Sequence, residues 1–198
     1  MWVIRIGGSM SRDPRLPQWL ATIARLGGGR CVVVAGGGAF ADLARDAQAH
    51  WRFDDVAAHN MAVLAMAQTA YLLHGLEPAL QPARSETEIR AALRRGRVAL
   101  WLPFELLRER PDPIASWDVT SDSYALMLAR RLGAERLLVV KSCAVDRACS
   151  PAELSAAGVL DRRFPALAQD APLAIELLGC DELERARELL IGNVRVGA

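Results

Sequence analysis

The sequence is poor in the side chains that build disulfide frameworks and metal centres. It has four cysteines and three histidines in 198 residues, and no two cysteines form a C-x-x-C pair. Scattered cysteines of this kind are typical of reduced thiols, and a metal site would need ligands at closer spacing. We therefore expect free cysteines and no metal bound by the chain itself. The cysteines are Cys31, Cys143, Cys149 and Cys180.

An excess of either charge is also missing, since 24 lysine and arginine residues balance 23 aspartate and glutamate residues. Such a composition gives no indication of a nucleic-acid or membrane-surface partner, and we expect neither. One local basic cluster exists. Its spacing and its alanine and leucine neighbours favour the solvated face of a helix, with a binding patch as the alternative. The cluster consists of Arg90, Arg94, Arg95 and Arg97.

Long hydrophobic runs are lacking as well. No stretch approaches the roughly 20 consecutive apolar residues of a membrane span. The first residues show no basic leader followed by an apolar run and a small-residue cleavage site, because a strand pattern begins at Trp2. We therefore expect a cytoplasmic protein without a membrane partner.

Two well-known phosphate-binding motifs are absent from the glycine-rich turns of this chain. Neither the P-loop pattern G-x-x-x-x-G-K-[ST] nor the dinucleotide pattern G-x-G-x-x-G follows the strand patterns that end in glycine. The first absence argues against a P-loop fold. The second argues against a Rossmann-type oxidoreductase.

What the sequence does contain is a regular alternation of strand and helix patterns. Short, nearly continuous apolar runs are typical of strands buried on both faces, and segments with helical apolar spacing separate them. This alternation predicts an α/β fold over residues 1–198, a single three-layer αβα sandwich with a mainly parallel sheet. The expected strands are Trp2–Ile6, Cys31–Ala35, Val98–Leu102, Leu137–Lys141 and Leu173–Leu178. The expected helices are Pro17–Leu26, Phe40–Trp51, Val56–His74, Ser121–Leu132 and Asp181–Leu190.

Several boundaries carry their own signals. Thr120 is expected to cap the helix that follows it, and Asp181 with Glu184 resembles a capping box. The stretch Glu77–Ser85 contains two prolines and is expected to be a loop. The apolar helix Val56–His74 indicates a homodimer or a larger homo-oligomer.

Two glycine clusters follow the first two expected strands. Gly7 and Gly8 end the run "VIRIGGSM", and Gly36–Gly38 end the run "CVVVAGGGAF". Bare backbone followed by a helix N-terminus favours anion binding, because N–H groups and the helix dipole both face the ligand. Tight turns that need positive φ are the alternative. In an open parallel sheet the carboxyl ends of the strands are also where ligands collect.

Four motifs in order give the chain a resemblance to a known family. "VIRIGGSM", "VVVAGGGAFAD", "WDVTSDSYAL" and "LLVVKS" resemble motifs of the amino-acid kinase family. The compact length, Trp117 and the pair Phe164-Pro165 resemble its short branch, the [5-(aminomethyl)furan-3-yl]methyl phosphate kinases of methanofuran biosynthesis. The resemblance implies the amino-acid kinase (carbamate kinase-like) fold, ATP and Mg²⁺ as cofactors, and transfer of a phosphoryl group to a small-molecule phosphate or carboxyl acceptor.

The resemblance also implies roles for individual residues. Phosphoryl transfer asks the protein mainly for in-line positioning and for cations around the moving charge. The catalytic residues implied are Arg5, Asp122 and Lys141. The nucleotide-binding residues implied are Gly7, Gly8, Ser9, Ser121, Ser123, Lys141 and Asp146. The acceptor-binding residues implied are Gly36, Gly37, Gly38 and His59.

Most of these residues have a structural alternative. Asp122 is also what a helix dipole favours in a first turn, and the serines beside it are also ordinary capping residues. His59 fits a hydrogen-bonded histidine inside a helix. Lys141 has no such simple alternative, because it ends an apolar strand and an unpaired buried ammonium is costly.

The chain departs from the family pattern in two places. Arg5 stands where the family has lysine, and its fork of donors differs from a compact ammonium. The "DG" turn that usually follows the nucleotide strand is replaced by "KSCAVDRACSP". These departures keep a second hypothesis open, in which the chain binds a nucleotide or another anion without transfer and serves as a regulator, storage subunit or partner of an active kinase.

Overall fold

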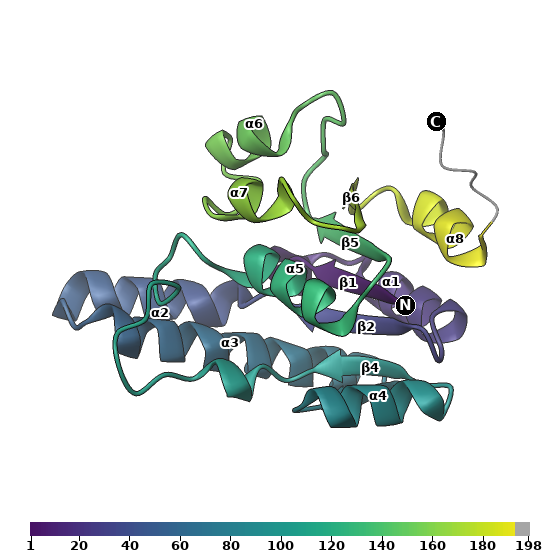
Figure 1. The fold of residues 1–198 in the computed structure, drawn as a ribbon, viewed down its shortest axis with the longest axis horizontal. Helices are drawn as coiled ribbons and strands as arrows, with labels where there is room; N and C mark the ends of the chain where they lie inside the picture. Colours follow the sequence, from purple (N-terminus) through teal and green to yellow (C-terminus); the bar gives the residue numbers. More distant parts are fainter. Residues whose placement is uncertain (193–198) are drawn as a thin grey trace.

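The computed structural model describes residues 1–192. Six parallel strands form one sheet in the order β3-β4-β2-β1-β5-β6. Crossovers through helices connect the strands, as parallel pairing requires, and the α/β sandwich expected from the sequence is confirmed (Figure 1). The strands are β1 Trp2–Ile6, β2 Cys31–Ala35, β3 Leu80–Ala83, β4 Val98–Trp101, β5 Arg136–Lys141 and β6 Ala174–Gly179.

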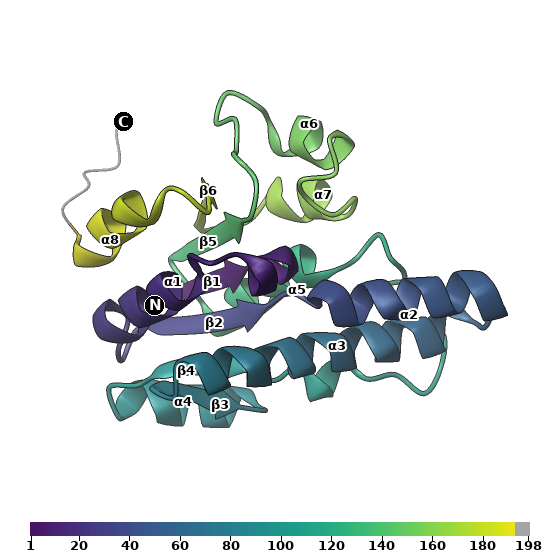
Figure 2. The same ribbon diagram turned by 180° about the vertical axis from the view of Figure 1, so that it is seen from behind.

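Helices cover both faces of this sheet. Residues of α4, α5 and α7 join one hydrophobic core cluster, and residues of α1, α3 and α8 join the other. Figure 1 has α4 and α5 in front of the sheet, and Figure 2 shows α1 and α3 on the opposite side. The helices are α1 Leu16–Leu26, α2 Gly38–Trp51, α3 Asp55–Leu76, α4 Glu86–Arg94, α5 Ser121–Leu132, α6 Pro151–Ala156, α7 Phe164–Ala168 and α8 Leu183–Ile191, with short 3-10 helices at η1 Gly8–Arg12 and η2 Phe104–Leu106.

The alternation of side chains along β1 and β5 brings two cations to one face. Val3 packs in the cluster under α5, whereas Ile4 and Ile6 pack in the opposite one. Arg5 therefore projects toward α5, because successive residues of a strand point to opposite faces. By the same argument Lys141 lies on the α5 side, one step past the pairing of Ile6 with Val140. Both reach the carboxyl end of the sheet.

Two expectations about element boundaries were wrong, and a third, the start of α5 after Thr120, is confirmed. The stretch Glu77–Ser85 is not all loop, since it contains β3. That strand lies at the edge of the sheet, where a proline such as Pro82 can be accommodated. The capping box at Asp181 is absent, because α8 begins at Leu183 and its N-cap residue is Glu182. The Glu182 carboxylate accepts from the Gly179 amide at 2.8 Å. Thr120 occupies the cap position of α5, but its side chain does not cap the helix.

Helix α3 corrects the statement about apolar runs. By length and composition alone its 22 residues could cross a membrane, with a mean hydropathy of 1.2 over the relevant window. Half of that window is buried inside the protein, where residues such as Val63, Ala70 and Leu73 join the core. A single helix of this kind is weak evidence for a membrane span, since core helices share its composition.

Candidate active site

A cavity of 1280 Å³ opens at the carboxyl end of the sheet. It runs from the glycine-rich ends of β1 and β2 to the loop before α5 and the segment joining α6 to α7. This is the position at which open parallel sheets bind their ligands. Predicted site residues that line it are Arg5, Gly8, Ser9, Gly37, Gly38, His59, Ser121, Asp122 and Lys141.

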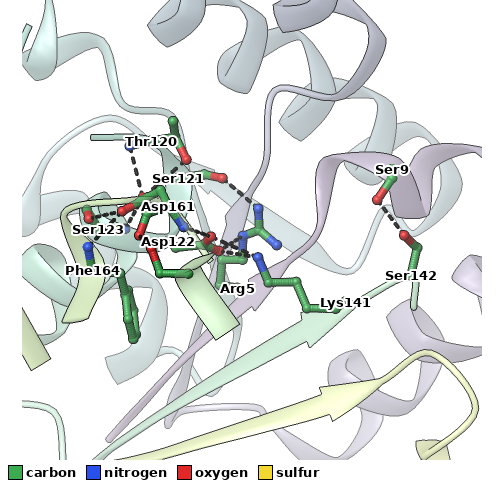
Figure 3. A network of polar contacts seen from close by, with 11 residues as sticks. Arg5, Ser9, Thr120, Ser121, Asp122, Ser123, Lys141, Ser142, Asp161 and Phe164 are labelled. Atoms are coloured by element: carbon green, nitrogen blue, oxygen red, sulfur yellow. Dashed lines mark hydrogen bonds and ion pairs between the residues drawn. The ribbon is translucent and has the colours of Figure 1, made fainter. Parts of the chain in front are cut away.

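Asp122 holds two buried cations at the floor of the cavity (Figure 3). The Lys141 ammonium donates to both carboxylate oxygens, at 2.9 and 2.8 Å. Arg5 Nε lies 2.9 Å from Asp122 Oδ1, and Arg5 Nη2 donates to Ser121 Oγ at 2.8 Å. All three ionic side chains are at most 10% exposed. The third guanidinium nitrogen, Arg5 Nη1, is buried without a hydrogen-bond partner among the described residues.

Burial and charge act against each other in this cluster. Burial by itself raises the pKa of Asp122, but the charges of Arg5 and Lys141, together with hydrogen bonds, outweigh it and hold that pKa below its ordinary range. Burial, followed by the charge of Arg5, lowers the pKa of Lys141 from 10.5 to about 8, although Asp122 opposes the shift. The ammonium is therefore charged at neutral pH and loses its proton in mildly alkaline solution.

Lys141 is the single lysine of the chain, which makes its titration directly observable. In protein labelled with 13C at lysine Cε, we expect one side-chain NMR resonance with a titration midpoint near pH 8. The Arg5→Gln variant removes the neighbouring positive charge, so its midpoint should move upward. A wild-type midpoint above pH 10 would mean that the ion pair with Asp122 outweighs burial and the charge of Arg5, which contradicts the expected balance.

The two glycine clusters touch each other backbone to backbone. A Cβ at Gly8 would lie 2.2 Å from the Gly38 nitrogen, and a Cβ at Gly36 would lie 2.4 Å from the Gly8 nitrogen. Gly38 also has a φ of +55°, which side-chain-bearing residues rarely adopt. Close approach of the two loops therefore explains Gly8 and Gly36, whereas the turn alternative, which needs a positive φ, applies to Gly38 alone of the five clustered glycines.

Not every glycine amide can reach a ligand. The Gly7 amide donates to Val140 O and the Gly36 amide to Ile6 O, both at 2.9 Å. The next amides along the chain, at the starts of η1 and α2, donate to no acceptor among residues 1–192. Thr69 of α3 supports this edge from behind, with its hydroxyl 3.1 Å from Gly37 O. The open amides are those of Gly8, Ser9, Gly37 and Gly38.

The predicted serines occupy three different environments. Ser121 accepts from Arg5 and lines the cavity. Ser123 is fully buried and does not line the cavity, and its hydroxyl donates to Asp161 Oδ1 at 2.6 Å. Ser9 is exposed, with its hydroxyl 2.6 Å from the hydroxyl of Ser142, which joins the end of β1 to the end of β5.

Of the predicted residues His59 and Asp146, the first lines the cavity and the second does not. His59 lines the cavity, but its Nε2 donates to Leu106 O at 2.7 Å and its Nδ1 lies 3.1 Å from the Tyr124 hydroxyl. The ring thereby ties α3 to η2 and to α5. Asp146 is exposed outside the cavity lining, and its carboxylate accepts from the Ala148 amide at 2.9 Å.

Asp161 is a site residue that the sequence analysis missed. Its carboxylate accepts hydrogen bonds from Thr120, Ser123 and Phe164, and its own amide donates to Asp122 (Figure 3). It lies about 40 residues from Asp122 in the sequence, between two short helices, and no motif marks it. The only available signal was its place in "LDRRFP", just before Phe164-Pro165.

No group of three histidine, cysteine or acidic side chains within residues 1–192 could hold a metal ion. Asp122, the carboxylate at the floor of the cavity, already serves two cations. Magnesium often binds through substrate phosphates with few protein carboxylates. The residues present therefore fit Mg²⁺ brought in on a nucleotide, and they do not fit a metal held by the protein alone.

These observations define a class of protein, the open parallel α/β proteins with a cavity at the carboxyl edge of the sheet. The sequence model of the amino acid kinase family matches residues 1–144. The chain belongs to the amino acid kinase family, as its motifs predicted.

Individual relatives agree with this assignment. The chain is 24% identical over 147 residues to [5-(aminomethyl)furan-3-yl]methyl phosphate kinase of Methanocaldococcus jannaschii, a match that covers 70% of this chain. The chain spans 64% of the length of that curated relative. Among solved structures, uridylate kinase from Archaeoglobus fulgidus superposes with a TM-score of 0.71 at 15% identity, covering 96% of this chain and 95% of that one. An isopentenyl phosphate kinase gives 0.65 at 13% identity, covering 97% and 96%. These two likenesses show the fold.

Proposed function

We propose that the chain transfers the γ-phosphoryl group of ATP to a small phosphate monoester and forms a diphosphate. The observation that carries this proposal is the pair of buried cations on Asp122. Arg5 and Lys141 stand at the carboxyl end of two adjacent strands and line the cavity, and Arg5 Nη1 has no partner there. Cations in a water-poor site stabilise the charge that spreads over a migrating phosphoryl group.

The proposed division of labour follows the lining of the cavity. The open amides of Gly8 and Ser9 would hold the transferring group, and those of Gly37 and Gly38 at the start of α2 would hold the acceptor phosphate. ATP would extend toward the segment joining α6 and α7. Mg²⁺ would supply further positive charge on the nucleotide phosphates.

A phosphate acceptor also fits the state of Asp122. The second pKa of a phosphate monoester is about 6, so such an acceptor is largely dianionic at neutral pH and needs no general base to attack. An alcohol acceptor would need one. The carboxylate of Asp122 is committed to Lys141 and Arg5, which suits an acceptor that arrives already ionised.

The similarity to the Methanocaldococcus enzyme makes [5-(aminomethyl)furan-3-yl]methyl phosphate our first choice of acceptor. The test is ADP release by purified protein with Mg-ATP and this phosphate, with the corresponding alcohol as the matched control. We expect turnover with the phosphate and none with the alcohol. Turnover with UMP or isopentenyl phosphate instead would keep the reaction and change the acceptor. ATP binding in a calorimeter without transfer to any phosphate would favour the second hypothesis, a non-transferring nucleotide-binding protein.

A further inference from the structure

The carboxylate of Asp161 joins the start of α5 to the start of α7. Its Oδ2 accepts from the Thr120 amide at 3.0 Å, the Thr120 hydroxyl at 3.2 Å and the Ser123 amide at 2.9 Å. Its Oδ1 accepts from the Ser123 hydroxyl at 2.6 Å and from the Phe164 amide at 2.9 Å. Asp161 thus supplies from a distance the cap that Thr120 does not make for α5, and it holds the start of α7 to the same point.

The backbone of Asp161 continues this connection to the charged cluster. Its amide donates to Asp122 Oδ2 at 3.2 Å, the oxygen that also accepts from Lys141 at 2.8 Å. Oδ1 of the same carboxylate faces Arg5 Nε and Lys141. The Asp122 carboxylate is therefore held by two side-chain cations and one amide, and the amide is the contact that comes from the far wall.

We propose that Asp161 is a positioning residue, which holds residues 157–166 against α5 and, through its own amide, fixes the Asp122 carboxylate between Arg5 and Lys141. Side chains of this segment line the cavity, including Leu160 and Arg162. Asp161 thus couples a ligand that contacts residues 157–166 to the orientation of the Asp122 carboxylate. The activity readout rests on the proposed kinase function, whereas the spectroscopic readout does not.

Asp161→Asn tests this role with little disturbance of α5. Asparagine caps helices about as well as aspartate, but its NH₂ group cannot accept from the Phe164 amide. We expect kcat to fall about 10- to 100-fold with little change in KM, as for a misplaced reacting group. We also expect the NMR titration midpoint of Lys141 to fall below its wild-type value near pH 8, because its amine loses a negative neighbour and a well-placed partner.

The Ser123→Ala variant distinguishes the effect of the position of Asp161 from the effect of its charge. It removes the 2.6 Å hydrogen bond to Asp161 and leaves every charge in place. The same two readouts should shift in the same direction, by a smaller amount. Asp170→Asn, an identical substitution at an exposed position after α7, is the matched control and should leave both readouts unchanged.

Two results would overturn the proposal. If Asp161→Asn keeps the wild-type kcat and the wild-type titration midpoint of Lys141, then Asp161 does not position the Asp122 carboxylate. If Ser123→Ala keeps the wild-type kcat and the wild-type titration midpoint of Lys141 while Asp161→Asn changes both, only the charge of Asp161 matters. If the wild-type protein transfers no phosphoryl group to any acceptor, the kinase function fails, and the titration of the single lysine still decides the role of Asp161.

Discussion

Asp122→Asn is expected to lower the rate of phosphoryl transfer by about 100-fold or more and to destabilise the fold by about 3–5 kcal/mol. The amide cannot neutralise Arg5 and Lys141, which are both buried and held by this one carboxylate. Without the carboxylate Arg5 is left as an unpaired buried cation, and the Lys141 amine loses the partner that favours its charged form, so both side chains lose the charge arrangement that transfer requires. Single-turnover kinetics and urea unfolding measure the two effects.

The low pKa of Asp122 gives the same variant a pH signature. In the wild-type protein this carboxylate contributes stability that is present above the ordinary aspartate pKa and is lost as the pH falls through the lower folded value. Asp122→Asn should lack that contribution at neutral pH. Asp46→Asn, an exposed position on α2, is the control and should unfold like wild type. Normal stability in Asp122→Asn would contradict the ion-paired cluster.

Gly8→Ala is expected to destabilise the protein by about 3 kcal/mol and to abolish phosphate binding. The added methyl group would meet the Gly38 nitrogen at 2.2 Å and the Gly38 Cα at 2.7 Å. Backbone atoms cannot rotate out of the way as a side chain can, so η1 and the start of α2 must separate. Both groups of open amides then move. Thermal unfolding and calorimetric titration with ATP measure the outcome.

Gly75→Ala provides a control with the opposite expected sign. Gly75 lies in the last turn of α3, and a Cβ there would meet nothing within 4 Å. Alanine in a helix interior is more favourable than glycine by about 0.5–1 kcal/mol, so this variant should be slightly more stable and should bind ATP normally. Equal behaviour of the two variants would mean that contact between the glycine loops does not hold the site.

The elements that hold the charged cluster could be predicted because their signals are local. Nearly continuous apolar runs marked β1 and β5, and a cation at Arg5 or Lys141 inside such a run is conspicuous on its own. Asp122 follows a plausible helix start. Parallel pairing then brings the ends of these strands together, so sequence position translates directly into spatial position.

The remaining features depend on contacts that a local pattern does not contain. Asp161 reaches the site through a tertiary hydrogen-bond network, and its sequence neighbours are unremarkable loop residues. The interior position of Ser123 follows from that network. The glycine amides that are occupied donate to carbonyls of a neighbouring strand, and the open ones do not. A run of identical residues such as Gly36–Gly38 gives no sequence signal of which amide is paired.

The direct meeting of Gly8 with Gly36 and Gly38 has a consequence for how this protein can change. The spacing between the ends of β1 and β2 is set by main chain alone, so exchanging side chains cannot widen or narrow it by small steps. Under the function proposed above, substitutions that change the preferred acceptor are therefore expected at the outer rim of the cavity, where Arg45 stacks on Trp117 at 4.4 Å, and not at the glycines.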